Sequence, residues 1–173
     1  DLGDSLNRED IRNIAYRSRV YQQFFSGNMS SAQRWARVAL ESAATDESID
    51  ILDVYHLIGL SYYNSANKSD SNLKYWKLGF QTAVELNDDY RISFFATNLG
   101  TLFFELEMMS ISREFFLKAL IQAKLINAVT PMLINNIITT LINDKDISSA
   151  KKYMNEYSDL LNVKPDNYEN QAI

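Results

Sequence analysis

Apolar residues recur at three- and four-residue spacing along almost the whole chain, which is the period of one face of an α-helix. The 173 residues include only five Gly and two Pro. Sandwiches and barrels need many tight turns, which use those two residues, so they are disfavoured. We predict an all-α chain with helices over residues 7–26, 30–45, 49–64, 71–87, 90–108, 111–126, 131–143 and 147–161.

The length suits one domain with its own hydrophobic core. Hydrophobic residues make up 46% of the chain and charged residues 23%, which is typical of a globular protein rather than a disordered one. We predict a single helical repeat domain over 7–163, a frayed N-terminus over 1–6 and a polar C-terminal tail over 164–173.

The charge balance bears on the kind of partner. Acidic residues (22) outnumber basic ones (17), the net charge is −5, and no basic run occurs. Binding to a nucleic-acid backbone needs Lys and Arg to replace counterions, so we expect no direct contact with nucleic acid or with an anionic membrane surface. No apolar stretch approaches the roughly 20 residues that span a bilayer, so we expect no membrane insertion by this segment. Cysteine is absent, which fits the cytoplasm and the periplasm equally.

A spacing pattern recurs in the second helix of each predicted pair. Its three positions are separated by four and three residues, and they read Ala32-x3-Ala36-x2-Ala39, Trp76-x3-Phe80-x2-Ala83, Ser112-x3-Phe116-x2-Ala119 and Ala150-x3-Met154-x2-Tyr157. The third members are 44, 36 and 38 residues apart. The first helices share a second element, seen as Ile58-Gly59-x2-Tyr62 and Leu99-Gly100-x2-Phe103. Helix pairs on such a period are typical of a solenoid.

These elements resemble the tetratricopeptide repeat, over roughly residues 12–161. The resemblance implies a right-handed superhelical stack of about four antiparallel helix pairs, a TPR-like α-solenoid. It also implies that Gly on the first helix and Ala on the second let the two helices approach closely, and that the aromatic fills the space where pairs meet. Arg19-Val20 and Ile137-Ile138 replace the Leu-Gly element in the first and fourth repeats, so related helical-pair repeats stay open.

The predicted helix 131–143 carries two opposite stripes. One is apolar and consists of Ile134, Ile137, Ile138, Leu141 and Ile142. The other is polar but uncharged and consists of Asn135, Asn136, Thr139, Thr140 and Asn143. A solvated helix face usually carries Lys and Glu, whereas Asn amides both donate and accept hydrogen bonds, as a peptide backbone requires. This stripe indicates peptide binding, and an ordinary solvent face is the alternative.

In tetratricopeptide proteins the first helices line the concave surface. By that resemblance, the expected partner-binding residues of a concave groove are Arg17, Tyr21, Phe24, His56, Tyr63, Thr97, Thr101, Phe104, Asn135, Asn136, Thr139 and Asn143. The family also has members that clamp a terminal carboxylate with Lys and Asn at set positions. Arg17 is the one base in this set, so such a clamp is disfavoured.

Residues that could carry catalysis are sparse. The chain has one histidine, His56, and lacks CxxC, HExxH and a Gly-rich phosphate loop. We therefore predict no catalytic residues, no metal site and no cofactor, and expect that the protein is not an enzyme. His56 has a packing or groove-lining role as its simplest interpretation, with a pH-sensing role as the alternative.

Two functions fit these features. The first is a non-catalytic protein- or peptide-binding scaffold. The alternative is a ligand- or partner-sensing segment of a larger bacterial signalling or transcription-regulatory protein. The apolar and aromatic residues of the last predicted helix also suggest self-association, either as a homodimer or with further chain downstream; they are Tyr153, Met154, Tyr157, Leu160 and Leu161.

Overall fold

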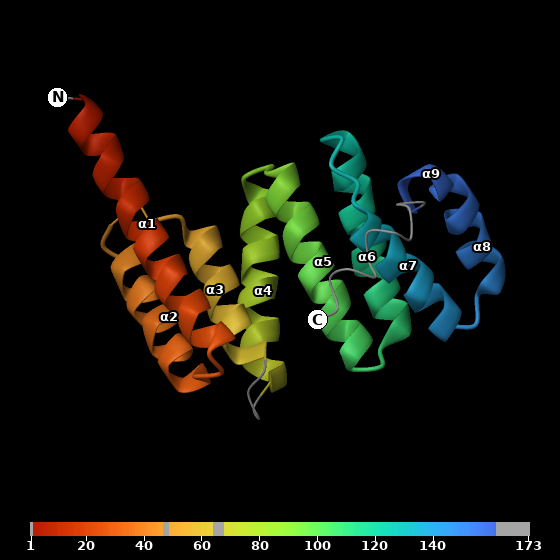
Figure 1. The fold of residues 1–173 in the computed structure, drawn as a ribbon, viewed down its shortest axis with the longest axis horizontal. Coiled ribbons are helices and arrows are strands. Elements are labelled where there is room, and N and C mark those ends of the chain that lie inside the picture. The colour runs from red at the N-terminus through yellow and green to blue at the C-terminus, as the bar shows by residue number, and fades with distance from the viewer. Residues whose placement is uncertain (1, 47–48, 64–67, 162–173) are drawn as a thin grey trace. The chain divides into compact units, whose positions relative to one another are not determined.

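The computed structural model describes residues 2–46, 49–63 and 68–161, and every regular element in those ranges is a helix (Figure 1). This confirms the all-α prediction. The helices are α1 (Leu2–Phe25), α2 (Met29–Ala43), α3 (Ile51–Tyr63), α4 (Lys68–Glu85), α5 (Asp89–Glu105), α6 (Met109–Leu125), α7 (Pro131–Asn143), α8 (Ile147–Glu156) and α9 (Ser158–Leu161). In the part of the chain that is described, no helix is both long and apolar enough to cross a membrane.

Two helix ends differ from the predicted ones. The helix α1 begins at Leu2, so residues 2–6 are helical where fraying was predicted. An existing helix extends easily, because each added residue contributes one hydrogen bond without a new nucleation cost. The predicted helix 147–161 is divided at Tyr157, where the backbone leaves the helical region with φ −112° and ψ 23°. The predicted tail over 164–173 lies outside the described residues.

Five of the turns between helices share one backbone geometry. The second residue after each of these helices has a positive φ, and these residues are Gly27, Asn87, Glu107, Asn127 and Lys145. In each turn the next residue donates its N–H to a carbonyl five positions earlier, as Asn28 does to Gln23 at 2.8 Å. This is the Schellman motif, which satisfies carbonyls left over at a helix end. It keeps the connections between consecutive helices short.

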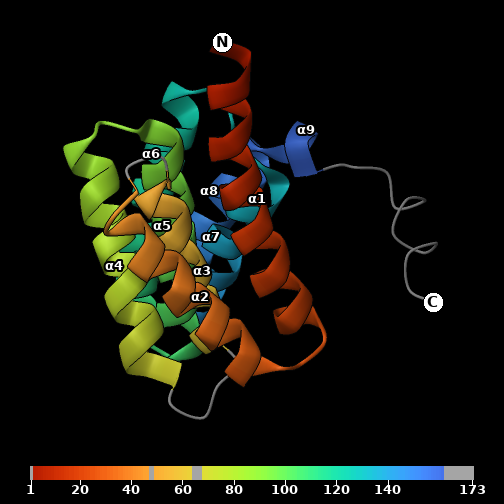
Figure 2. The same cartoon turned by 90° about the vertical axis from the view of Figure 1, so that its left-hand side faces the viewer.

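The chain divides into two compact units, residues 1–91 and 92–173, and each is described by itself. The prediction of one domain over 7–163 stays a prediction. In the first unit α1 packs on α2, α2 on α3, and α3 on α4 (Figures 1 and 2). In the second unit α6 packs on α7 and α7 on α8. The helices named here therefore pack on their neighbours in the sequence within each unit.

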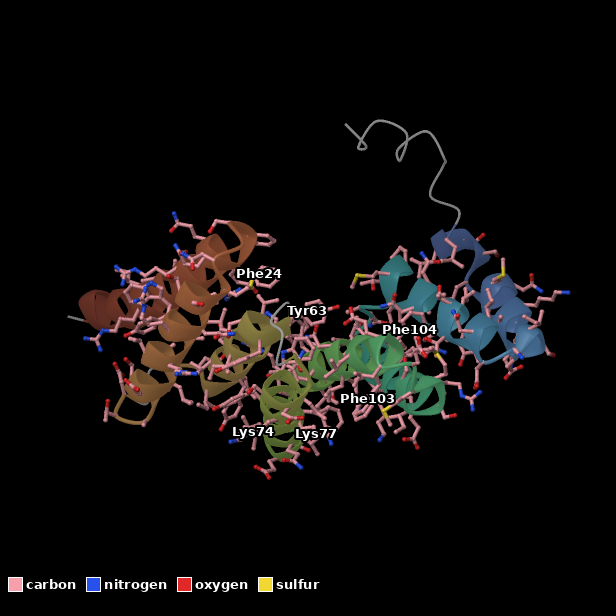
Figure 3. The ribbon with its side chains drawn as sticks, turned by 90° about the horizontal axis from the view of Figure 1, so that it is seen from below. Phe24, Tyr63, Lys74, Lys77, Phe103 and Phe104 are labelled. Carbon is pink, nitrogen blue, oxygen red and sulfur yellow. The ribbon has the colours of Figure 1, made fainter. Side chains whose placement is uncertain are left out.

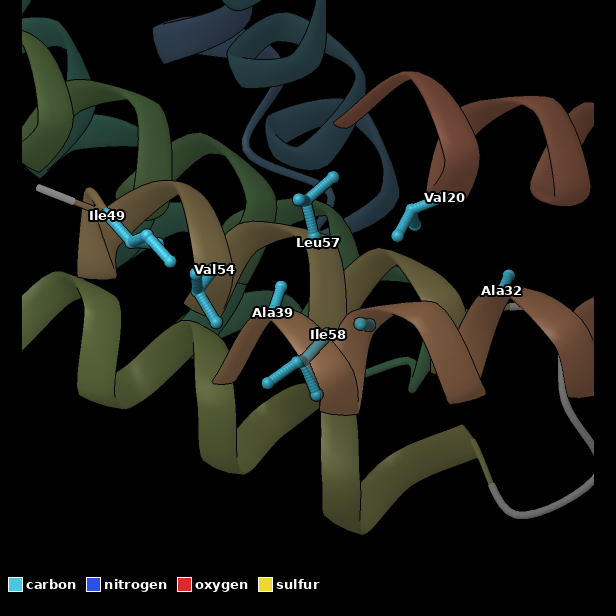
Figure 4. Close-up of a cluster of buried hydrophobic side chains, with 8 residues drawn as sticks. Val20, Ala32, Ala39, Ile49, Val54, Leu57 and Ile58 are labelled. Atoms are coloured by element: carbon cyan, nitrogen blue, oxygen red, sulfur yellow. The ribbon is translucent and has the colours of Figure 1, made fainter. Parts of the chain in front are cut away.

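One hydrophobic cluster of the first unit lies between α1, α2 and α3. It combines alanines of α2 with branched residues of α1, α3 and the segment before α3 (Figure 4), and its buried members are Val20, Ala32, Ala36, Ala39, Ile49, Val54, Leu57 and Ile58. Alanine has almost no side chain, so the backbone of α2 can approach its neighbours closely. The predicted role of the small residues on this second helix fits this packing.

Glycines on α3 and α5 mark the closest contacts within two helix pairs. A Cβ added at Gly59 would lie 2.1 Å from Nε1 of Trp76 on α4. A Cβ added at Gly100 would lie 2.6 Å from Cδ1 of Phe116 on α6. Both distances are far below van der Waals contact, so the aromatic ring occupies the space that a side chain at each glycine would need. The ring fills the space inside its own helix pair.

These contacts correct the repeat register in the second pair. The ring against Gly100 is Phe116, the second member of its predicted triplet. The ring against Gly59 is Trp76, which is the first member of its predicted triplet, so that triplet is misaligned by four residues. The residues of α4 that correspond to Ser112, Phe116 and Ala119 are Asn72, Trp76 and Gly79, and all three are buried. Ala39, Gly79 and Ala119 are then evenly spaced at 40 residues. Trp76 and Phe80 are both large and apolar, so the spacing alone could not distinguish the two alignments.

The two faces of α7 are close to the predicted stripes but not identical to them. Ile134, Ile137, Ile138 and Leu141 are buried. Thr140, predicted on the polar stripe, is fully buried, and its hydroxyl donates to the Asn136 carbonyl at 2.8 Å. Ile142, predicted on the apolar stripe, is 49% exposed. The buried arc is rotated towards Leu133 and Thr140, because helices pack against both flanks of α7.

Candidate functional site

The predicted groove residues of the first unit come from α1 and α3, which contact each other. The Tyr21 hydroxyl and Nε2 of His56 are 2.9 Å apart, within hydrogen-bonding distance, and both side chains are half-buried. Burial lowers the pKa of His56 to about 4. The ring is therefore neutral near pH 7, and this pair contributes a polar but uncharged spot to the surface.

An ion-pair network lies beside that pair. Arg17 donates to Asp53 at 3.2 Å. Asp53 also accepts from Arg91 at 2.5 Å, and Arg91 donates to Asp50 at 2.7 Å. The two arginines are thus matched by two aspartates. Arg17, the predicted groove base, is exposed but carries a charge that Asp53 already balances in part.

Two further predicted residues, Phe24 and Tyr63, lie on one side of the first unit, opposite Lys74 and Lys77 of α4 (Figure 3). Phe24 is half-buried and packs edge-on against Phe25, with ring centroids 5.4 Å apart. Tyr63 packs on Trp76 at 5.8 Å. Both rings are thus held by neighbours while part of each stays accessible, which suits an apolar contact surface.

In the second unit, four predicted residues meet around one small open pocket. Thr101 and Phe104 come from α5, and Asn136 and Thr139 come from α7. Phe116 of α6 completes the lining, and the space holds about 50 Å³. Phe104 and its neighbour Phe103 point in different directions (Figure 3). Phe103 is buried and stacks on Phe115 with centroids 5.5 Å apart, which leaves Phe104 for the pocket.

The hydrogen bonds of these side chains decide what the pocket can offer. The Thr101 hydroxyl donates to the Thr97 carbonyl at 3.1 Å, and that of Thr97 donates to the Ser93 carbonyl at 2.9 Å. Both hydroxyl protons are therefore already used within α5. Within the described ranges, the amide groups of Asn135 and Asn136 form no side-chain hydrogen bond. These two amides remain able to donate to and accept from a ligand.

The other predicted residues lie nearby without lining the pocket. Asn143 is exposed and donates to the Thr139 carbonyl at 2.8 Å, so its carbonyl oxygen remains as an acceptor. Asn135 is exposed one position before Asn136. The pocket is uncharged: its lining consists of two hydroxyls, one amide and two aromatic rings. Such a lining can hold an uncharged group and offers no general acid or base.

Sequence reasoning missed two residues of these surfaces. Asp53 joins both arginines of the network, and it lies one helical turn before His56, so its place on the same face of α3 could have been read from the spacing. Phe116 was assigned to packing between helices, yet one side of its ring also lines the pocket. No signal in the sequence separates those two roles.

The neutral His56 leads to a pH prediction. Its folded pKa lies below the unfolded value, near 6.5, so the unfolded chain binds the proton first as pH falls. Stability attributable to His56 is fully present above about pH 6.5 and is lost down to about pH 4, by up to about 3 kcal/mol. Urea titrations across that range should show a steeper loss for the wild type than for His56→Gln. Parallel curves would mean that burial does not suppress protonation of this ring.

Within the described ranges, no group of three or more His, Cys, Asp or Glu side chains is placed to hold a metal ion. Comparisons of the chain with models of protein families, with curated proteins and with solved structures find no significant match.

Proposed function

We propose that this protein is a non-catalytic scaffold that binds a protein or peptide segment on the face formed by its first helices. The observation that carries the proposal is the pocket of the second unit, where Thr101, Phe104, Asn136 and Thr139 meet. The pocket combines two aromatic rings with the amide of Asn136. Recognition sites usually have this composition, since apolar area supplies affinity and a few polar groups set orientation.

The proposed ligand is an extended, uncharged stretch of peptide. Asn136 can accept from a backbone N–H and donate to a backbone carbonyl at the same time, and Asn135 can do so beside it. A volume of about 50 Å³ suits one small aliphatic side chain rather than an aromatic one. A charged side chain would lose its hydration there without gaining an opposite charge.

The proposed architecture is a TPR-like, right-handed superhelical stack of about four antiparallel helix pairs. Three observations support it. Glycines that face an aromatic ring recur on α3 and α5, and Ala39, Gly79 and Ala119 are spaced evenly. Helices α1 to α4 pack in sequence order in the first unit, as do α6 to α8 in the second. A stack of this kind creates an extended surface from successive first helices.

The test begins with selection of binders from a displayed library of random peptides, followed by affinity measurement for a selected peptide. We expect Asn135→Ala combined with Asn136→Ala to weaken binding at least tenfold, because both backbone-directed amides are lost. Stability should change little, since Asn135 is exposed and neither amide bonds to another described residue. The unfolding midpoint of the double variant checks that point.

The matched control removes polar groups from another exposed helix face, with Ser148→Ala and Asn155→Ala on α8. Peptide affinity should be unchanged in this control. If the selected peptides bind the Asn135/Asn136 double variant as tightly as the wild type, or lose equal affinity in the α8 control, the pocket is not where the peptide lies.

A further inference from the structure

The outer faces of α2 and α4 carry the same charge pattern. Arg34 and Arg37 lie on the exposed side of α2, and Lys74 and Lys77 lie on the exposed side of α4. Each lysine follows its arginine counterpart by 40 residues, the spacing that separates Ala39 from Gly79 in the buried register. The four cations therefore occupy equivalent places on two successive second helices. We call these four residues the α2/α4 basic face.

Side chains of α2, α3 and α4 lie close together beside this face. The Arg37 guanidinium on α2 donates to the Tyr62 hydroxyl at 2.8 Å, and it also interacts electrostatically with Tyr75 of α4. Tyr75 packs on the same core as Ala36 and Ala39, and the Lys74 ammonium lies 5.4 Å from the centre of its ring. Lys74 and Lys77 lie on the side of the unit opposite Phe24 and Tyr63 (Figure 3).

Glu41 of α2 acts electrostatically on Arg37, but the cations of this face are paired less closely than several arginines elsewhere. Arg12, Arg17, Arg91 and Arg113 each form a salt bridge with an aspartate. In the part of the chain that the structure describes, no side chain of the basic face forms a salt bridge with an acid. At the equivalent places on α6 the chain has Glu114 and Leu117, so the pattern is confined to α2 and α4. The chain as a whole has a net charge of −5, so a recurrence of four exposed cations on two successive second helices departs from its overall balance.

We propose that the α2/α4 basic face docks an acidic peptide segment of a partner protein. Four cations suit a short run of Asp and Glu, whereas nucleic-acid binding rests on a larger number of phosphate contacts and would be opposed by the net charge of −5. The Lys74 ammonium lies over the Tyr75 ring and occupies a face on which a base could otherwise stack. This docking is separate from the peptide binding proposed at the pocket of the second unit.

The probe is a fluorescent hexaglutamate peptide, titrated with the full chain by anisotropy at low salt and at physiological salt. We expect binding that weakens as salt rises, because exposed charges are screened. Arg34→Glu combined with Lys74→Glu should reduce the affinity at least tenfold. Lys151→Glu combined with Lys152→Glu makes the same charge change on the exposed side of α8 and should alter it less than twofold.

The outcomes are distinct. Equal losses in the two charge-reversal variants, or no binding of hexaglutamate at low salt, would overturn the proposal. Binding of a single-stranded oligonucleotide, or of vesicles rich in anionic lipid, more tightly than hexaglutamate would identify that ligand instead. Either result would also overturn the proposal of an acidic peptide. The Asn135/Asn136 double variant should bind hexaglutamate normally, so failure of this inference and failure of the proposed function are told apart.

Discussion

Gly59→Ala is expected to destabilise the protein by about 3 kcal/mol or more. The added Cβ would lie 2.1 Å from Nε1 of Trp76, whose ring is rigid and 3% exposed. Accommodating the methyl group requires the ring or the whole of α4 to move away from α3. Helix propensity alone predicts the opposite sign, because Ala in a helix interior is favoured over Gly by about 1 kcal/mol. The sign of the change in unfolding free energy therefore decides whether this close approach exists.

Two further variants sharpen this measurement. Gly27→Ala changes a glycine that has a φ of +76° and open space around it, so it should cost only about 1 kcal/mol of backbone strain. Combining Gly59→Ala with Trp76→Leu should cost less than the two single changes together, because the smaller side chain vacates the space that the methyl group needs. Unchanged or increased stability of Gly59→Ala would show that α3 and α4 do not pack through this contact.

Phe116→Ala is expected to cost about 3–5 kcal/mol, the usual range for removing a buried aromatic ring. Phe116 is 2% exposed and lies against Gly100, which has no side chain to fill the space left behind. Phe116→Leu should cost less, since most of the volume is kept. Urea unfolding of the three proteins gives the comparison, with Phe25→Ala as the control because Phe25 is 79% exposed and should contribute little.

The Phe116 ring is buried and also forms part of the lining of the proposed pocket, so changing it should affect both stability and peptide binding. Phe116→Leu should retain the fold while deepening the pocket. Peptides selected against this variant should therefore carry a larger aliphatic side chain at the anchor position than those selected against the wild type. A small loss of stability in Phe116→Ala, below about 1 kcal/mol, would contradict the burial of this ring.

The helices and several of their ends followed from the sequence by itself, because period and capping are local properties. The predicted start of α7 at residue 131 is confirmed, and there the Thr130 hydroxyl accepts from Leu133 N–H at 3.2 Å. Asp146 likewise accepts from Ser149 N–H at the start of α8. Gly59 and Gly100 were assigned to close approach between helices before the structure placed aromatic rings against them. Each of these features depends on a few neighbouring residues.

Only the tertiary structure decided which residue meets which. Spacing could not distinguish Trp76 from Phe80 as the ring against Gly59, since both lie on the apolar side of α4. The burial of Thr140 and the exposure of Ile142 depend on how α7 is rotated between its neighbours, which its own sequence does not record. The ion pairs of Asp53 join residues 36 and 38 positions apart. Periodicity shows that a face is covered, whereas the covering residue is set by packing between distant segments.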